Sequence, residues 1–246
     1  MKETLTDTRG TFNFADGEVL LVDKPLRWTS FDVVRKIRNA IKPLKVKVGH
    51  AGTLDPLATG LLVICTGKFT KRIDTFQAEE KEYTGTFTLG ATTPSYDLER
   101  EIDQRFDWST LTEDQILKTV ASFVGEIEQT PPAHSAIKMD GERVYEKARR
   151  GETVDVKPRR VWIREFEITR IALPEVDFRV VCSKGTYIRS LAHDVGKALN
   201  NGAYLSNLRR TRSGNFHVTD AWQVKDLVDC IKGSTFASSH EDIQKP

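Results

Sequence analysis

The stretch GHAGTLDPLATGLL, residues 49–62, decides how this chain folds and acts, because it joins a glycine-punctuated loop to the start of a buried strand. Its three glycines let the backbone approach a ligand closely. Pro56 favours an extended backbone at Asp55 and stiffens the loop. A rigid loop that presents one carboxylate suits positioned chemistry. An Asp-Pro turn between two strands explains the same residues equally well, so the local pattern leaves both interpretations open.

The sequence on either side of this stretch predicts strands and helices in irregular order. Apolar or alternating runs predict strands at Glu18–Val22, Leu61–Cys65, Lys81–Gly90, Val161–Ile171 and Val176–Cys182. Helical spacing predicts helices after the N-caps Ser30 and Thr112, over Ile188–Leu199 and over Val224–Ile231. Because no regular β-α-β order repeats, we expect an α+β fold with a mixed, largely antiparallel central sheet flanked by helices.

The composition of the 246-residue chain excludes several classes of protein. Its longest apolar run, Leu61–Cys65, has five residues, whereas a membrane span needs about 20. Met1–Gly10 contains no apolar core of a secretory signal, and the three cysteines form no CxxC pair. We therefore expect a cytoplasmic protein without a disulfide framework or a membrane span.

Two kinds of ligand site are also not expected. Gly67-Lys68 is followed by Phe69 rather than Ser or Thr, so the chain lacks a P-loop for nucleotide phosphates. His50 and Asp55 have no second histidine or carboxylate pair nearby in the sequence. A metal site is therefore not expected at this loop.

Charge is segregated along the chain, although its 37 Lys and Arg nearly balance its 35 Asp and Glu. Residues 35–54 carry six bases and no acid, and residues 197–214 carry four bases and no acid. Residues 95–128 carry nine acids against three bases. Two acid-free runs suit an anionic partner such as RNA. Solvated surface charge explains each run by itself.

Six motifs resemble those of the TruB-type tRNA pseudouridine synthases, in the order in which that family has them. One is the stretch of residues 49–62, which resembles the signature loop of the family. The others are Lys24-Pro25 with Thr29-Ser30, Lys81-Glu82-Tyr83 with Leu89-Gly90, Pro131-Pro132 with Ser135-Ala136 and Lys138, Cys182–Arg189, and Leu208-Arg209-Arg210-Thr211. Each short motif alone is weak evidence for the resemblance, but six motifs that agree with the family in the same order are unlikely to arise by chance.

The resemblance implies a pseudouridine synthase-like fold and isomerisation of the position-55 uridine in the T loop of tRNA to pseudouridine. It implies no metal, ATP or redox cofactor. Asp55 matches the catalytic aspartate of the family and is assigned as nucleophile, with attack on the sugar C1′ and attack on uracil C6 both left open. The target uridine lies inside the folded T loop, so it has to flip out to reach Asp55.

The resemblance also assigns roles to other residues. Arg189 matches the family's arginine, whose fork suits pairing with a carboxylate, although an exposed helix position explains it as well. Tyr83 matches the active-site tyrosine, which stacks on uracil or moves a proton, although its strand face also predicts core packing. The remaining matches are to substrate-binding positions: His50, Lys24, Asp97, Lys138, Tyr187 and Leu208. Ordinary packing also explains the last two.

The chain departs from the family pattern in three places. Arg27 stands where the KP motif of the family usually has glycine, so we expect that turn to differ. The acidic segment that usually reads TxTxD is altered at Thr93–Asp97, where Asp97 takes the place of the acid. The C-terminal PUA-type RNA-binding module of many relatives is expected to be absent, so the catalytic domain is expected to hold RNA by itself.

We therefore expect one catalytic domain over residues 1–235, an RNA-contacting insertion at residues 131–151 and a flexible tail at residues 236–246. The bases of the insertion suit phosphate contacts: Lys138, Arg143, Lys147, Arg149 and Arg150. The expected partner is the tRNA T arm, bound by a monomer. Two other functions stay open, namely a non-catalytic tRNA-binding or tRNA-folding protein and a small-molecule phosphate enzyme that uses the glycine-rich loop.

Overall fold

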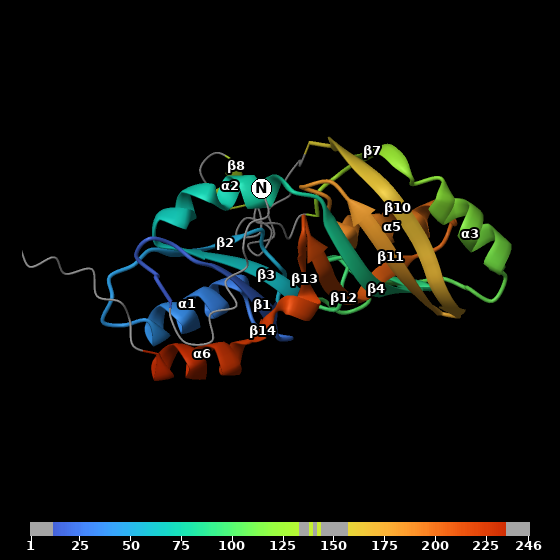
Figure 1. The fold of residues 1–246 in the computed structure, drawn as a ribbon. Helices are drawn as coiled ribbons and strands as arrows, with labels where there is room; N and C mark the ends of the chain where they lie inside the picture. Colours follow the sequence, from blue (N-terminus) through green and yellow to red (C-terminus); the bar gives the residue numbers. More distant parts are fainter. Residues whose placement is uncertain (1–11, 133–137, 140–141, 144–156, 235–246) are drawn as a thin grey trace, which may run out of the picture. The chain divides into compact units, whose positions relative to one another are not determined.

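The computed structural model describes residues 12–132, 138–139, 142–143 and 157–234, and Figure 1 labels most of their helices and strands. The described residues form two compact units: unit 1 runs up to Glu79 and resumes at Arg210, and unit 2 runs from Glu80 to Arg209. Helices occur at irregular intervals among strands that pair mostly antiparallel, which confirms the expected α+β fold class. The single catalytic domain over residues 1–235 stays a prediction, and residues 236–246 lie outside the described part of the chain.

Unit 1 is built on strands from both ends of the chain. Its strands are β1 (Val19–Lys24), β2 (Val48–Ala51), β3 (Ala58–Thr66), β13 (Phe216–His217), β14 (Trp222–Gln223) and the end of β12 (Ala203–Ser213). β3 runs antiparallel to both β1 and β2, whereas β1 runs parallel to β14. The strands predicted at residues 18–22 and 61–65 correspond to β1 and β3 and are confirmed.

The side chains of β1 and β3 alternate between two apolar layers. On one face, alternate residues of both strands pack against α1 (Ser30–Ala40) and α6 (Val224–Gly233). On the other face, the intervening residues pack against η1 (Gly67–Arg72), α2 (Ile73–Ala78) and η2 (Val218–Asp220). Figure 1 shows α1 and α6 side by side on one side of these strands and α2 on the other. Removal of apolar surface from water, at about 25 cal/mol per Å², stabilises both layers.

Helix α1 is capped by Thr29 rather than by Ser30. The Thr29 side chain accepts a hydrogen bond from the backbone N–H of Asp32 at 3.0 Å, and Asp32 Oδ2 accepts one from the Thr29 N–H at 3.0 Å. This reciprocal pair is a capping box. The prediction that Ser30 caps the helix is wrong, because the buried Ser30 hydroxyl bonds the backbone of Leu54 instead.

Unit 2 contains an antiparallel sheet. Its strands are β4 (Lys81–Leu89), β7 (Gly125–Gln129), β10 (Arg159–Ala172), β11 (Glu175–Cys182) and the first part of β12. β11 pairs with both β4 and β10, and β10 pairs with β7. Phe87 on β4 stacks on Phe178 on β11 with ring centroids 5.8 Å apart, and both side chains are buried. The strands predicted at residues 81–90, 161–171 and 176–182 are confirmed.

Two helices and two short strand pairs complete the described part of unit 2. Helix α3 (Glu113–Ala121) starts at the predicted capping box of Thr112 and Gln115, and α5 (Ile188–Ala198) starts directly after Tyr187. The short strand pairs are β5 (Ala91–Thr92) with β6 (Gln104–Arg105), and β8 (Lys138–Met139) with β9 (Glu142–Arg143). β8 and β9 belong to the predicted insertion, whose residues 133–137, 140–141 and 144–151 lie outside the described part of the chain.

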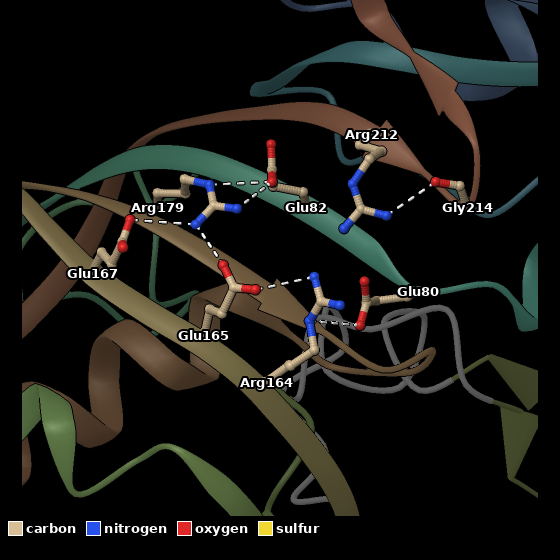
Figure 2. A network of polar contacts seen from close by, with 8 residues as sticks. All are labelled: Glu80, Glu82, Arg164, Glu165, Glu167, Arg179, Arg212 and Gly214. Atoms are coloured by element: carbon tan, nitrogen blue, oxygen red, sulfur yellow. Dashed lines mark hydrogen bonds and ion pairs between the residues drawn. The ribbon is translucent and has the colours of Figure 1, made fainter.

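Arg179 on β11 is the centre of an ionic network on one face of this sheet (Figure 2). Its guanidinium lies 2.7 Å from Glu82 on β4, 2.7 Å from Glu165 on β10 and 3.3 Å from Glu167 on β10. Arg164 extends the network to the other oxygen of Glu165 at 3.1 Å. The hydrogen bond from Arg179 lowers the pKa of the exposed Glu165 carboxyl. The network therefore links three neighbouring strands through their outward side chains.

Candidate active site

The loop that carries Asp55 is held first through the residue before it. Asp55 lies between β2 and β3. The backbone N–H of Leu54 donates to Ser30 Oγ at 2.8 Å, and the Leu54 carbonyl accepts from the same hydroxyl at 3.1 Å. A hydroxyl can serve as donor and acceptor at once, so Ser30 satisfies both buried backbone groups. The first residue of α1 thereby positions the chain next to Asp55.

The residue after Asp55 is held as well. The carbonyl of Pro56 accepts from the backbone N–H of Arg27 at 2.7 Å and from the Lys24 ammonium at 3.5 Å. Lys24 donates to two further backbone carbonyls at 3.0 and 2.6 Å and is fully buried. A buried ammonium needs such partners because it has left water. Asp55 is therefore fixed from both sides.

Lys24 is also a cationic neighbour of Asp55. Burial is the main cause that lowers the pKa of Lys24 to about 8. The negative charge of Asp55 raises that pKa, and the positive charge of Arg210 lowers it. The Asp55 carboxylate and the Lys24 ammonium therefore favour each other's charged form. The structure places Lys24, which was expected to bind substrate, beside the proposed nucleophile.

Arg210 on β12 ties down the rest of the loop. It is 1% exposed, and it donates to the Leu61 carbonyl at 2.7 Å and to the Gly52 carbonyl at 3.1 Å. Gly60 has a φ of +101°, and a Cβ there would lie 2.3 Å from the Arg210 carbonyl oxygen, so only glycine fits. Burial, and then the charge of Arg210, lowers the pKa of His50. This lowering favours the neutral imidazole of His50.

The left-handed backbone of Arg27 is the conformation that favours the glycine usual at this position in the family. Its φ is +67°, a conformation that a residue with a Cβ adopts at a cost of about 1–2 kcal/mol. Arg27→Gly is therefore expected to raise the free energy of unfolding by about 1 kcal/mol. Arg38→Gly, in the last turn of α1, is the control and is expected to lower it by about 1 kcal/mol. Urea unfolding measures both, and a destabilised Arg27→Gly protein would contradict the explanation.

Arg189 and Asp97 form a buried ion pair in unit 2. Arg189 Nε lies 3.6 Å from Asp97 Oδ2, and the two side chains are 5% and 8% exposed. Arg189 Nη1 also donates to the Ser95 carbonyl at 3.3 Å, and Asp97 Oδ1 accepts from the Glu99 N–H at 2.9 Å. The interpretation of Arg189 as an exposed helix residue is therefore wrong. The altered segment Thr93–Asp97 still brings a carboxylate to the arginine.

An aromatic stack holds this altered segment against α5. Tyr96 has a φ of +62°, and its ring stacks on His193 with centroids 3.9 Å apart and planes 16° apart. Burial lowers the pKa of His193, which favours the neutral imidazole. His193 follows Arg189 by one helical turn, so one face of α5 contacts both Tyr96 and Asp97.

Tyr187 is held at its backbone and at its ring. Its N–H donates to Gln129 Oε1 at 2.7 Å, and its carbonyl accepts from Gln129 Nε2 at 3.0 Å. The Arg159 guanidinium lies over the ring, 4.6 Å from the centroid, which is a cation–π contact. Tyr187 nevertheless stays partly exposed. Its ring is therefore both positioned and accessible.

Tyr83 on β4 is partly buried, whereas Phe87 and Leu89 on the same strand face are buried. Side chains alternate along a strand, so Glu82 points to the opposite face, where Arg179 binds it (Figure 2). The ionic network thus fixes β4 from the face away from Tyr83. A role for Tyr83 in catalysis stays a prediction.

The two remaining predicted residues, Leu208 and Lys138, both belong to unit 2. Leu208 on β12 is 9% exposed, so it packs against its neighbours. Lys138 has its backbone in β8, and its side chain lies outside the described part of the chain.

Unit 1 brings together Asp55, Lys24 and the loop of His50, and unit 2 brings together Arg189, Asp97 and the start of α5 at Tyr187.

Sequence reasoning missed three residues that position these groups: Ser30, Arg210 and Gln129. Ser30 and Arg210 stood within quoted motifs, but the sequence assigned Ser30 to a helix cap and assigned Arg210 no role. Gln129 stands two residues before Pro131-Pro132, and that closeness to a motif was the available signal. All three bond backbone groups far away in the sequence, which no local pattern reveals.

The described residues carry neither a metal cluster nor a helical membrane span. Within the described ranges, no group of three or more His, Cys, Asp or Glu side chains is placed to hold a metal ion. Nor is any helix there long and apolar enough to cross a membrane. Cys65, Cys182 and Cys230 form no disulfide bond, and burial raises the pKa of Cys65 to about 11.

Comparison with models of protein families shows to which family this chain belongs. Residues 38–188 match the N-terminal domain of the TruB family pseudouridylate synthases, and residues 189–240 match the tRNA pseudouridylate synthase B C-terminal domain. The chain belongs to the TruB family. The resemblance of the six motifs is thereby confirmed, and so is the predicted enzyme class, a pseudouridine synthase.

Similar TruB-family proteins cover nearly the same length as this chain. The tRNA pseudouridine synthase B of Flavobacterium johnsoniae is 61% identical over 213 residues, which are 85% of this chain and 93% of that protein. The tRNA pseudouridine synthase B of Bacteroides fragilis is 56% identical over 229 residues, which are 92% of this chain and 94% of that protein.

Solved structures similar to this TruB-family chain come from larger proteins. A chain of a Cbf5–Nop10–Gar1 complex matches with a TM-score of 0.69 and 33% identity, over 88% of this chain and 55% of that one. A chain of an H/ACA RNP bound to a substrate RNA containing 2′-deoxyuridine matches with a TM-score of 0.65 and 29% identity, over 93% of this chain and 60% of that one. The chain thus spans less than two thirds of these solved proteins.

Proposed function

We propose that this TruB-family protein isomerises the position-55 uridine in the T loop of tRNA to pseudouridine. Relatives at 61% and 56% identity carry the name tRNA pseudouridine synthase B, which supports the choice of substrate. The observation that carries the proposal is the fixed backbone around Asp55: hydrogen bonds hold Leu54 and Pro56, the residues on either side of it. Such fixation is what a positioned nucleophile requires.

The proposed reaction balances without a cofactor. The N1–C1′ glycosidic bond breaks, uracil turns within the site, and a C5–C1′ bond forms. The C5 hydrogen leaves as a proton, and N1 gains a proton. Asp55 acts as nucleophile on the flipped-out nucleotide, with attack at C1′ and attack at C6 both compatible with its fixed position. Lys24 favours the ionised carboxylate that this step needs.

The remaining residues take the roles that the family motifs assign them. Tyr83 and Arg189 act with Asp55 in catalysis. Tyr83 stacks on the base or moves a proton, and Arg189 supplies a fixed positive charge. The residues proposed to bind RNA are His50, Lys24, Asp97, Lys138, Tyr187 and Leu208. We also propose that the protein works as a cytoplasmic monomer without metal, that residues 1–235 act as one catalytic domain, and that residues 131–151 contact the T arm.

Tritium release from a T-arm stem-loop tests this function. In an RNA stem-loop with [5-³H]uridine at position 55, formation of the C5–C1′ bond releases the label into water. We expect release of close to one tritium per RNA, and a loop with [5-³H]cytidine at that position serves as the control. Binding of the stem-loop without release would instead support a non-catalytic tRNA-binding or folding protein. Absence of both binding and release would leave the small-molecule phosphate enzyme as the remaining candidate function.

Binding of the stem-loop is expected to weaken as salt rises. Basic runs that contact phosphates release counterions, so the logarithm of the affinity falls with the logarithm of the salt concentration. Two phosphate contacts already lower the affinity roughly tenfold between about 50 and 200 mM salt. Fluorescence anisotropy of a labelled stem-loop measures this slope, and an affinity independent of salt would contradict phosphate contacts.

A further inference from the structure

The side chain of Gln129 pairs with the backbone of Tyr187 as a neighbouring strand would. Gln129 ends β7 and is fully buried. Its Oε1 accepts from the Tyr187 N–H at 2.7 Å, and its Nε2 donates to the Tyr187 carbonyl at 3.0 Å. The two residues are 58 positions apart in the sequence. One side-chain amide thus bonds both backbone polar groups of the residue that precedes α5, and the Tyr187 carbonyl also accepts from the Leu191 N–H at 3.1 Å.

A second bond next to this pair strengthens the same junction. Ser190, in the first turn of α5, donates from its hydroxyl to the Thr130 carbonyl at 2.8 Å. Gln129 and Thr130 are consecutive, and they hold residues on either side of Arg189. Two successive residues at the end of β7 therefore fix both the entry into α5 and its first turn.

The residues fixed in this way are the ones assigned to the substrate. Tyr187 presents a partly exposed ring under Arg159, and Arg189 reaches the buried carboxylate of Asp97 at 3.6 Å. We propose that Gln129 is a positioning residue, whose buried amide sets the placement of Tyr187 and Arg189 for the isomerisation. The proposal rests on the proposed function, because it concerns the geometry of that same site.

The amide of Gln129 meets both requirements here without a charge. A methionine of similar volume offers neither hydrogen bond, and a carboxylate accepts from the Tyr187 N–H but repels its carbonyl oxygen. Charged residues next to this position are Arg159, which pairs with Gln129 in the β7–β10 register, and the neighbouring pair Arg160 and Glu128. Arg189 lies two residues beyond Tyr187, and its guanidinium faces Asp97. A glutamate substitution would therefore add a charge where the native contact has none.

The experiment compares Gln129→Glu and Gln129→Met with Gln115→Glu in the full chain. Gln115 Oε1 only accepts hydrogen bonds, from the N–H and hydroxyl of Thr112, so a carboxylate replaces it without loss. We expect kcat for tritium release at about pH 8 to fall on the order of 100-fold in both Gln129 variants, as a displacement of about 1 Å can produce. Gln115→Glu is expected to stay within about threefold of the parent protein.

Lowering the pH distinguishes the loss of the hydrogen bond to Tyr187 from a general loss of structure in the variants. When the carboxyl introduced by Gln129→Glu is protonated, it can donate to the Tyr187 carbonyl as the amide does. Burial at this position raises the pKa of a carboxyl above its usual value of about 4.3. The kcat of Gln129→Glu, relative to the parent protein at the same pH, is therefore expected to rise between about pH 8 and pH 5. Gln129→Met is expected to show no such recovery. A Gln129→Met protein with kcat within threefold of the parent would overturn the proposal.

A spectroscopic readout keeps this test apart from the test of function. The chain has five tyrosines, so ¹⁵N-tyrosine labelling gives few amide signals, and Tyr187→Phe identifies the one from Tyr187. In Gln129→Glu this signal should titrate with the same midpoint as kcat. A signal that titrates while relative kcat stays flat, or that does not titrate, overturns the positioning role. A parent protein that releases no tritium overturns the proposed function instead, whatever the amide signal shows.

Discussion

Asp55→Asn is expected to abolish pseudouridine formation while the affinity for the T-arm stem-loop stays within about threefold of the parent protein. The amide has nearly the volume of the carboxylate, so the loop held at Leu54 and Pro56 keeps its shape. An amide oxygen is a poor nucleophile and cannot form the bond that the proposed mechanism requires. Loss of an attacking nucleophile lowers turnover on the order of 10⁶-fold. Tritium release measures the rate, and anisotropy of the labelled RNA measures the affinity.

Asp229→Asn is the matched control for this substitution. Asp229 lies on the exposed side of α6 in unit 1, and its replacement removes the same charge from the same unit. Turnover of this variant is expected to equal that of the parent protein. If Asp55→Asn released tritium at the parent rate, the assignment of Asp55 as nucleophile would be wrong. If both variants lost activity together, the effect would be one of overall charge.

Arg189→Met is expected to remove activity and also to lower the free energy of unfolding by about 3–5 kcal/mol. Methionine keeps the stem of the side chain but leaves the Asp97 carboxylate buried without the guanidinium that lies 3.6 Å away. An uncompensated buried charge is strongly destabilising. Arg164→Met is the control, since Arg164 is 51% exposed in its contact with Glu80 and should change stability by at most about 1 kcal/mol.

The double variant Arg189→Met with Asp97→Asn separates the two effects of the arginine. Removing both charges leaves no unpaired buried ion, so the double variant should recover a large part of the lost stability. Activity should stay lost, because the fixed positive charge is still missing. Urea unfolding and tritium release measure the two properties on the same samples. A double variant that regains both would show that Arg189 serves the fold alone.

Local patterns predicted much of the fold. The alternation of residues 81–90 corresponds to β4, and the capping box of Thr112 and Gln115 starts α3, because both signals lie within a few residues of chain. The six motifs located Asp55 and Arg189 in the family pattern. The departure at Arg27 was visible too, but the left-handed backbone angle that makes this departure costly is revealed only by the coordinates.

The contacts that fix the candidate site could not be predicted in this way. Ser30 bonds Leu54 across 24 residues, Gln129 bonds Tyr187 across 58, and Arg210 bonds Leu61 across 149. In each contact a side chain meets a backbone group, and backbone groups carry no residue-specific signal. Ser30 illustrates the consequence: a serine at a helix start suggests a cap, and the neighbouring Thr29 fills that role instead.

The division of unit 1 between the two ends of the chain sets an order of assembly during protein synthesis. Val22 on β1 pairs with Trp222 on β14, and α1 packs against α6. All of unit 2 is synthesised between the two halves of unit 1. At about 5–20 residues per second, the early half waits roughly 10–30 seconds for its missing strand and helix. The apolar face of β1, β3 and α1 stays incomplete for that time, so the unit that holds Asp55 is the last to be finished.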